Sequence, residues 1–276
     1  MIGCQGAVSQ KNHNLAIEHY NSGLRKLRQH DLQGAYWDFE YANHLDPGIA
    51  KVHYSLGHVY YLMHDREDAK KELHKALRNN PDKSSTYNYL GEIALEQKNL
   101  EEALIDFRKA LENTLNRTPY YPLANIGKVY LQMGKFELAK EYFSKALLRN
   151  ENFLPAHYWM GKVHLSEGAY EKALLDFSAA IRIQPNFSAG YYELGRAYLK
   201  LENQEKATRA FEEAVRLDPN SSIGIKAKRF LLILPKSFQS HKKSVSGNTG
   251  SVRTGWVDLN KRLLFLTRLM VAHNIL

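Results

Sequence analysis

Histidine is the residue type with the widest chemistry in this sequence, and the chain contains 12 of them. His157 and His164 are 7 positions apart, which on a helix is two turns, or about 10.5 Å, and too far for the two rings to share a metal ion. His53 and His58 are 5 positions apart and point to different faces of a helix. We therefore predict that the chain holds no metal ion and no cofactor.

Paired carboxylates are the second group that we considered for chemistry. Glu101 and Glu102 are neighbours, as are Glu212 and Glu213, and neighbouring side chains on a helix point about 100° apart, so they do not converge on one substrate. Motifs of zinc proteases, nucleophile elbows, phosphate loops and calcium loops are absent from the sequence. The prediction is a protein that is not an enzyme.

Composition and charge favour a helical binding protein. The helix formers alanine, leucine, glutamate and lysine dominate a chain of 276 residues, 44% of which are hydrophobic. The net charge of +9 is compatible with an acidic partner, an anionic membrane surface or nucleic acid. Because neither a glycine-rich nucleotide loop nor an aromatic RNA-binding signature accompanies the charge, we predict no nucleic-acid binding.

A pattern of small and aromatic residues repeats along the chain at intervals of about 34 residues. Its best-formed copy runs from Ser188 to Asn220. That copy contains Leu194, Gly195, Tyr198, Ala207, Phe211, Ala214 and Pro219. This pattern resembles the tetratricopeptide repeat, in which Gly195 and Ala207 would lie where two antiparallel helices cross closely. We predict an all-α fold: a right-handed superhelical solenoid of six such repeats with a C-terminal capping helix.

Four segments are expected from the boundaries of the repeats. Residues 1–15 are a polar tether, residues 16–234 the solenoid with its capping helix, residues 235–255 a flexible basic linker and residues 256–276 an amphipathic helix. Arg268 argues against a transmembrane span in the last segment, which leaves docking onto the solenoid, an interfacial membrane helix or a partner contact open.

The first helix of each repeat is expected to line a concave groove that binds a protein segment. Counting Ser188 as position 1, position 5 of the six repeats reads Tyr20, Tyr54, Asn88, Ala124, Tyr158 and Tyr192. Position 9 reads Leu24, His58, Glu92, Lys128, Lys162 and Arg196. Tyrosine supplies flat contact area at a low entropic cost, and the three cations would make the C-terminal half of the groove positive. Packing of these tyrosines between repeats is the alternative.

Six repeats, a turn lengthened around Thr118, Pro119 and Tyr120, and Cys4 directly after Ile2 and Gly3 together resemble the type IV pilus biogenesis and stability lipoproteins, the pilotins. This resemblance implies a lipid-anchored scaffold on the periplasmic side of the outer membrane that helps a secretin to assemble or localise, with Cys4 as the lipid acceptor. A cytoplasmic tetratricopeptide adaptor that binds a peptide segment of a partner is the alternative. A third class is a peptidoglycan or nucleic-acid binder that uses the basic tail.

Overall fold

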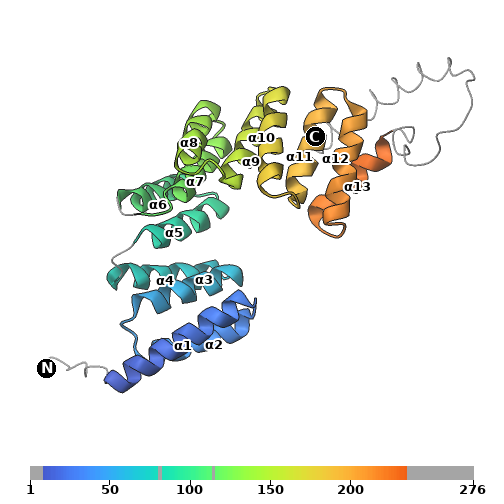
Figure 1. Cartoon of the computed structure of the whole chain (residues 1–276). Helices are drawn as coiled ribbons and strands as arrows, with labels where there is room; N and C mark the ends of the chain where they lie inside the picture. The colour runs from blue at the N-terminus through green and yellow to red at the C-terminus, as the bar shows by residue number, and fades with distance from the viewer. Residues whose placement is uncertain (1–8, 80–82, 114–115, 235–276) are drawn as a thin grey trace, which may run out of the picture. The chain divides into compact units, whose positions relative to one another are not determined.

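The computed structural model describes residues 9–79, 83–113 and 116–234, and within these ranges the chain is all α-helical. The described helices are α1 (Gln10–Arg28), α2 (Leu32–Leu45), α3 (Ala50–Leu62), α4 (Arg66–Asn79), α5 (Ser84–Glu96), α6 (Leu100–Glu112), α7 (Tyr120–Gln132), α8 (Phe136–Arg149), α9 (Leu154–Ser166), α10 (Tyr170–Ile183), α11 (Ser188–Lys200), α12 (Gln204–Leu217) and α13 (Ser222–Ile233). They form six consecutive helix pairs followed by a single helix (Figure 1). Cys4, the predicted linker and the predicted helix at 256–276 lie outside the described residues.

The two helices of each pair touch at a glycine, as the sequence predicts. A Cβ atom added to Gly127 of α7 would lie 2.7 Å from the ring of Phe143 in α8. The same contact occurs at Gly23 with Phe39, Gly91 with Phe107, Gly161 with Phe177 and Gly195 with Phe211, while Leu73 takes the place of the ring beside Gly57. All five phenylalanine side chains are fully buried, so each pair has its own small core.

One turn geometry joins the helices inside every pair. The residue at position 15 has a left-handed backbone in all six pairs, with glycine there only at Gly134 and Gly168. The others, with φ between 56° and 65°, are His30, His64, Lys98 and Glu202. The amide of the next residue then donates back to a carbonyl in the first helix, as from Asn99 to Ala94 at 2.8 Å, which satisfies carbonyls at the helix end. The turn is therefore fixed by backbone geometry more than by residue type.

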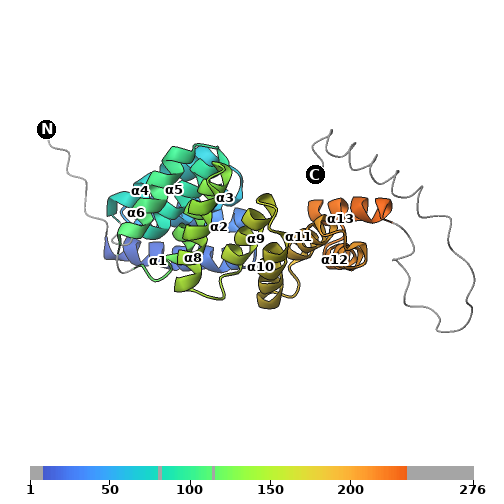
Figure 2. The ribbon, with the colours of Figure 1, turned by 90° about the horizontal axis from the view of Figure 1, so that it is seen from above.

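Successive pairs stack so that the odd-numbered helices form one layer. Each odd-numbered helix from α1 to α11 packs against the even-numbered helix that follows it, as α9 does against α10 in Figure 2. The odd-numbered helices also contact each other from one pair to the next, from α3 with α5 through to α11 with α13. We call this layer the inner layer. The observed stack of helix pairs confirms the predicted all-α solenoid.

The two ends of the stack differ from the sequence prediction in detail. Helix α1 begins at Gln10 instead of Ala16, because the side chain of Ser9 accepts a hydrogen bond from the amide of Asn12 at 3.2 Å and so starts the helix early. Residues 10–15 therefore belong to the first helix and not to a tether. At the other end, α13 covers the last pair, with the rings of Phe230 and Phe211 stacked at 4.7 Å between centroids.

Helix α13 buries one narrow face against the last pair. Phe230 and Leu234 are buried, together with Ala227. Ile225 is 45% exposed because it lies one residue after the buried Gly224, about 100° around the helix from the buried face.

The side chain of Asn116 stabilises the lengthened turn between α6 and α7. Asn116 donates to the carbonyl of Ala110 at 3.2 Å and accepts from the amide of Thr118 at 2.9 Å. Pro122 is buried in the first turn of α7. Across the described residues, none of the helices has the length and apolar content needed to cross a bilayer.

Candidate protein-interaction groove

The ten residues predicted to face the groove all lie on inner-layer helices. Tyr20 is on α1, Tyr54 and His58 on α3, Asn88 and Glu92 on α5, Lys128 on α7, Tyr158 and Lys162 on α9, and Tyr192 and Arg196 on α11. Their surroundings divide them into three groups, which are aromatic residues that pack between pairs, a network around Glu92 and a charged triad around Glu193. Contact of these residues with a partner stays a prediction.

The tyrosines at position 5 pack against the cores of the helix pairs. Tyr158 contacts Phe177 in its own pair at 6.0 Å and Phe187, just before α11, at 5.3 Å between ring centroids. Tyr192 contacts Phe211 and Phe230 in the same way and is only 8% exposed. These contacts therefore agree with the alternative given in the sequence analysis, in which the tyrosines pack between repeats.

A second aromatic group surrounds Tyr89, which was not among the predicted groove residues. The ring of Tyr89 on α5 lies 5.7 Å from Tyr54, 5.1 Å from His58 and 5.7 Å from Tyr61 between centroids. Burial lowers the pKa of His58, which favours the neutral form of this imidazole. The group joins α3 to α5 on the inner layer.

Glu92 is the centre of a hydrogen-bond network that spans α5 and α7. Its Oε1 atom accepts from Asn88 and from Asn125, each at 3.0 Å, and Asn125 also donates to Asn88 at 3.1 Å. Lys128 donates to Asn125 at 3.2 Å and lies 5.6 Å from the ring centroid of Trp159. We call Asn88, Glu92, Asn125 and Lys128 the Glu92 network.

Burial shifts both charged members of the Glu92 network towards their neutral forms. It raises the pKa of Glu92, against the opposing effect of the Asn125 hydrogen bond and the Lys128 charge. It lowers the pKa of Lys128, against the attraction of Glu92. Each charge is thus partly desolvated, and a further opposite charge near Glu92 would favour its ionised form.

A charged triad lies two helices further along the inner layer. Lys162 on α9 donates to Glu193 at 3.0 Å, and Arg196 donates to the other oxygen of the same carboxylate at 2.7 Å. Glu193 is 3% exposed and was not predicted as a groove residue. Because it neutralises part of the charge of Lys162 and Arg196, the C-terminal half of the inner layer is less positive than the sequence predicts.

A pocket of about 280 Å³ opens between α3, α5 and the start of α7. Of the predicted residues, Tyr54, Asn88 and Glu92 line it. The lengthened turn supplies another wall through Asn116, Thr118, Tyr121 and Pro122, and α5 adds Ser84, Ser85 and Tyr89. We call this the inner pocket. The sequence shows that the turn is lengthened but does not place it beside Asn88 and Glu92.

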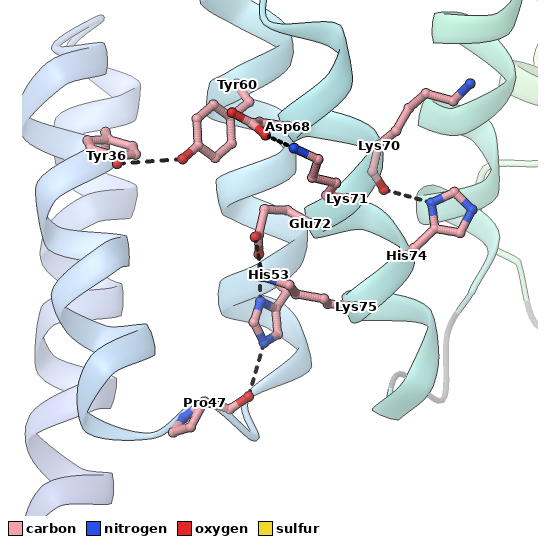
Figure 3. A network of polar contacts seen from close by, with 10 residues as sticks. All are labelled: Tyr36, Pro47, His53, Tyr60, Asp68, Lys70, Lys71, Glu72, His74 and Lys75. Atoms are coloured by element: carbon pink, nitrogen blue, oxygen red, sulfur yellow. Dashed lines mark hydrogen bonds and ion pairs between the residues drawn. The ribbon is translucent and has the colours of Figure 1, made fainter.

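Several of the described histidines contact a carboxylate inside or between helix pairs. His53 lies between two acceptors, with Nδ1 2.7 Å from Glu72 Oε2 and Nε2 3.0 Å from the carbonyl of Pro47 (Figure 3). A ring that donates to both acceptors carries two protons and a positive charge. In the described part of the chain, no group of three or more potential ligands could hold a metal ion.

Three of the carboxylates that contact histidines share one position of the repeat. They are Asp38, Glu72 and Asp176, all at position 23, and they contact His19, His53 and His164. Lys26, which replaces the usual aromatic residue in the first repeat, pairs with Asp38 at 2.8 Å. The carboxylate partners of His53 and His164 were not predicted. In the sequence, Glu72 follows His53 by 19 residues and Asp176 follows His164 by 12 residues.

Comparison with known families agrees with the repeat geometry. A family described as "Tetratricopeptide repeat" matches residues 54–117, and a second family of the same description matches residues 120–153. The chain is built from tetratricopeptide repeats. The family "Regulator of microtubule dynamics protein 1-3" matches residues 156–234, which cover the last two repeats and the capping helix. No curated protein matches the chain in sequence at a significant level.

Several solved tetratricopeptide structures share the fold. PilF of Pseudomonas aeruginosa aligns with 80% of this chain and 100% of its own, at 24% identity and a TM-score of 0.66. PilW, described as a widely conserved type IV pilus biogenesis factor, aligns with 77% of this chain and 98% of its own, at 20% identity and a TM-score of 0.69. A chain of the APC/C hetero-tetramer Cut9-Hcn1 aligns with 81% of this chain but 43% of its own, at 16% identity and a TM-score of 0.71.

These comparisons establish the fold and the general role that it serves. The tetratricopeptide repeat is a fold that serves protein–protein interaction, and this chain is a tetratricopeptide scaffold for protein–protein interaction. The low identities to PilF, PilW and the Cut9-Hcn1 chain carry no further statement about its partner.

Proposed function

We propose that this scaffold is a pilotin-like factor that assists the assembly or localisation of a type IV pilus secretin. The main support is that the solenoid aligns with the full length of PilF and with nearly the full length of PilW. PilW is described as a type IV pilus biogenesis factor. In this proposal, the inner layer contacts a segment of the secretin subunit. Cys4 carries a lipid that holds the protein on the periplasmic side of the outer membrane.

The experiment uses the host cell with its own chromosomal copy replaced by variants. We expect deletion to reduce the amount of heat-resistant secretin multimer in outer-membrane fractions, and we expect a tagged wild-type protein to co-purify with secretin subunits. Cys4→Ser should abolish labelling by a radioactive fatty acid and move the protein out of the membrane fraction. Lys11→Gln, at an exposed position of α1, is the control for expression.

Two results would refute this proposal. One is a wild-type protein that recovers no secretin, and the other is fatty-acid labelling unchanged by Cys4→Ser. If the tagged protein co-purifies with a cytoplasmic protein and Cys4 carries no fatty-acid label, the result would instead support the role of a cytoplasmic tetratricopeptide adaptor. An in-frame signal segment upstream of Met1 in the gene would favour the pilotin role.

A further inference from the structure

The inner pocket combines one carboxylate with several aromatic rings and neutral acceptors. Glu92 forms part of its lining, and Tyr54, Tyr89 and Tyr121 line it as well. Ser85 and Asn116 contribute uncharged polar groups. Lys128 belongs to the Glu92 network but does not line the pocket. Among the described lining residues, Glu92 is the only one with a carboxyl group, and none is a lysine, arginine or histidine.

The hydrogen bonds of Glu92 leave one of its oxygens available to a ligand. Both Asn88 and Asn125 donate to Oε1. Among the described residues, no hydrogen bond reaches Oε2. Since a buried carboxylate is stabilised by a positive donor, the pocket offers a place where a cation gains more than a neutral group does.

The size of the pocket selects the kind of occupant. Pockets for drug-sized molecules enclose about 300–1,000 Å³, and this one encloses about 280 Å³. It is therefore suited to one side chain of a polypeptide that runs along the inner layer. A guanidinium group has a planar set of donors and stacks on tyrosine rings, whereas an ammonium group is a point charge that is more strongly hydrated.

We propose that the inner pocket receives an arginine side chain of the bound partner, which pairs with Oε2 of Glu92 and stacks against the tyrosine rings. This inference rests on the interaction-scaffold role and names the partner's chemistry at one point of the groove. It does not depend on whether the partner is a secretin. The lengthened turn is part of the site, since Tyr121 and Asn116 come from it or directly follow it.

The test uses the full chain and short peptides of glycine and serine with one central arginine, acetylated and amidated so that their ends carry no charge. Binding is followed by the amide NMR signals of Ser85, Asn88 and Thr118. We expect the arginine peptide to shift these signals. A peptide with citrulline, which has the same shape without the charge, should bind about ten-fold or more weakly. The lysine peptide should fall between the two.

Two pairs of variants separate the pocket from the fold. Glu92→Gln should weaken arginine-peptide binding about ten-fold, and Glu96→Gln, one turn further along α5, should not, because Glu96 pairs with Arg66 and does not line the pocket. Tyr121→Ala keeps the Glu92 network and should weaken binding, whereas the equally exposed Tyr41→Ala on α2 should not. Thermal unfolding of each variant checks that it is folded.

Equal binding of the arginine and citrulline peptides, or unchanged binding by folded Glu92→Gln protein, would overturn the inference. So would signals that respond only to a peptide with a free C-terminal carboxylate. Secretin recovery by wild-type protein that shows no response to the arginine peptide would refute this inference alone. A clear arginine response without secretin recovery would refute the pilus role and leave the pocket assignment standing.

Discussion

The ring of Phe143 lies where a side chain on Gly127 would begin, since a Cβ atom added to this glycine would stand only 2.7 Å from the ring. Helices α7 and α8 are therefore packed at the closest distance that glycine permits. The same relationship in the other phenylalanine-containing pairs makes this contact the basic unit of the stack.

Substitution of Gly127 should destabilise the protein in proportion to the size of the new side chain. We expect Gly127→Ala to lower the free energy of unfolding, and Gly127→Leu to lower it by about 1–3 kcal/mol, because the ring of Phe143 must be displaced. Gln132→Leu, at an exposed position of α7, is the control. Urea unfolding measures both, and an unchanged midpoint for Gly127→Leu would show that the crossing is not tight.

The pair formed by His53 and Glu72 should make stability depend on pH. The Glu72 hydrogen bond raises the pKa of His53 above 6.5, although burial opposes it. Its stabilising contribution is therefore complete below 6.5 and is lost as the pH rises through the folded-state pKa. For Glu72, hydrogen bonds from His53 and Lys75 outweigh burial and lower the pKa below 4.5, so its contribution is lost only as the pH falls through that lowered value.

This pH dependence is measured by comparing wild-type and His53→Gln protein in urea at a series of pH values. The stability advantage of the wild type should be largest at mildly acidic pH and should shrink as the solution becomes alkaline. His44→Gln removes an exposed histidine from α2 and should show no such trend. A constant difference between wild-type and His53→Gln protein across the series would contradict a charged His53.

At the left-handed turn position, introducing a glycine should stabilise the protein and removing one should destabilise it. Lys98 has a φ of 63°, which is unfavourable for a residue with a Cβ atom by about 1–2 kcal/mol. Lys98→Gly should therefore raise the melting temperature, since relief of strain exceeds the entropic cost of glycine. Gly134→Ala, at a φ of 71°, should lower it. The same sign for both substitutions would show that the turn does not hold this conformation in solution.

Glu193 should contribute to stability, because it is buried and accepts hydrogen bonds from two cations. Glu193→Gln leaves Lys162 and Arg196 without the carboxylate that they share, and we expect a loss of about 1–3 kcal/mol. Glu212→Gln, at an exposed position of α12, should have little effect. Differential scanning calorimetry of the two variants tests this, and equal melting temperatures would remove the structural role of the triad.

The sequence predicts the stack of helix pairs well because glycine and phenylalanine keep a constant spacing that depends only on contacts inside one repeat. It predicts the groove less completely because Glu193, Asn125 and Tyr89 act across repeats. All three stand at position 6, one residue after the position that was expected to face a partner. Whether such a side chain turns towards the next helix depends on the rotation of neighbouring helices, which a repeat pattern does not specify.

The inner pocket shows the same limit. The lining residues of the lengthened turn and Glu92 are far apart in sequence, and the packing of α7 on α5 brings them together. The sequence identifies the inserted residues but gives no sign that they complete a binding pocket.

The contacts between the described helices join elements that are one or two places apart in the chain. In such a linear stack, the terminal helix pairs have neighbours on one side only and unfold locally before the central pairs. Amide hydrogens in α7 to α10 should thus exchange with solvent most slowly. The pair that presents Gly127 and the helices beside it would remain ordered while the outer units open and close, which keeps a binding surface intact in the centre of the scaffold.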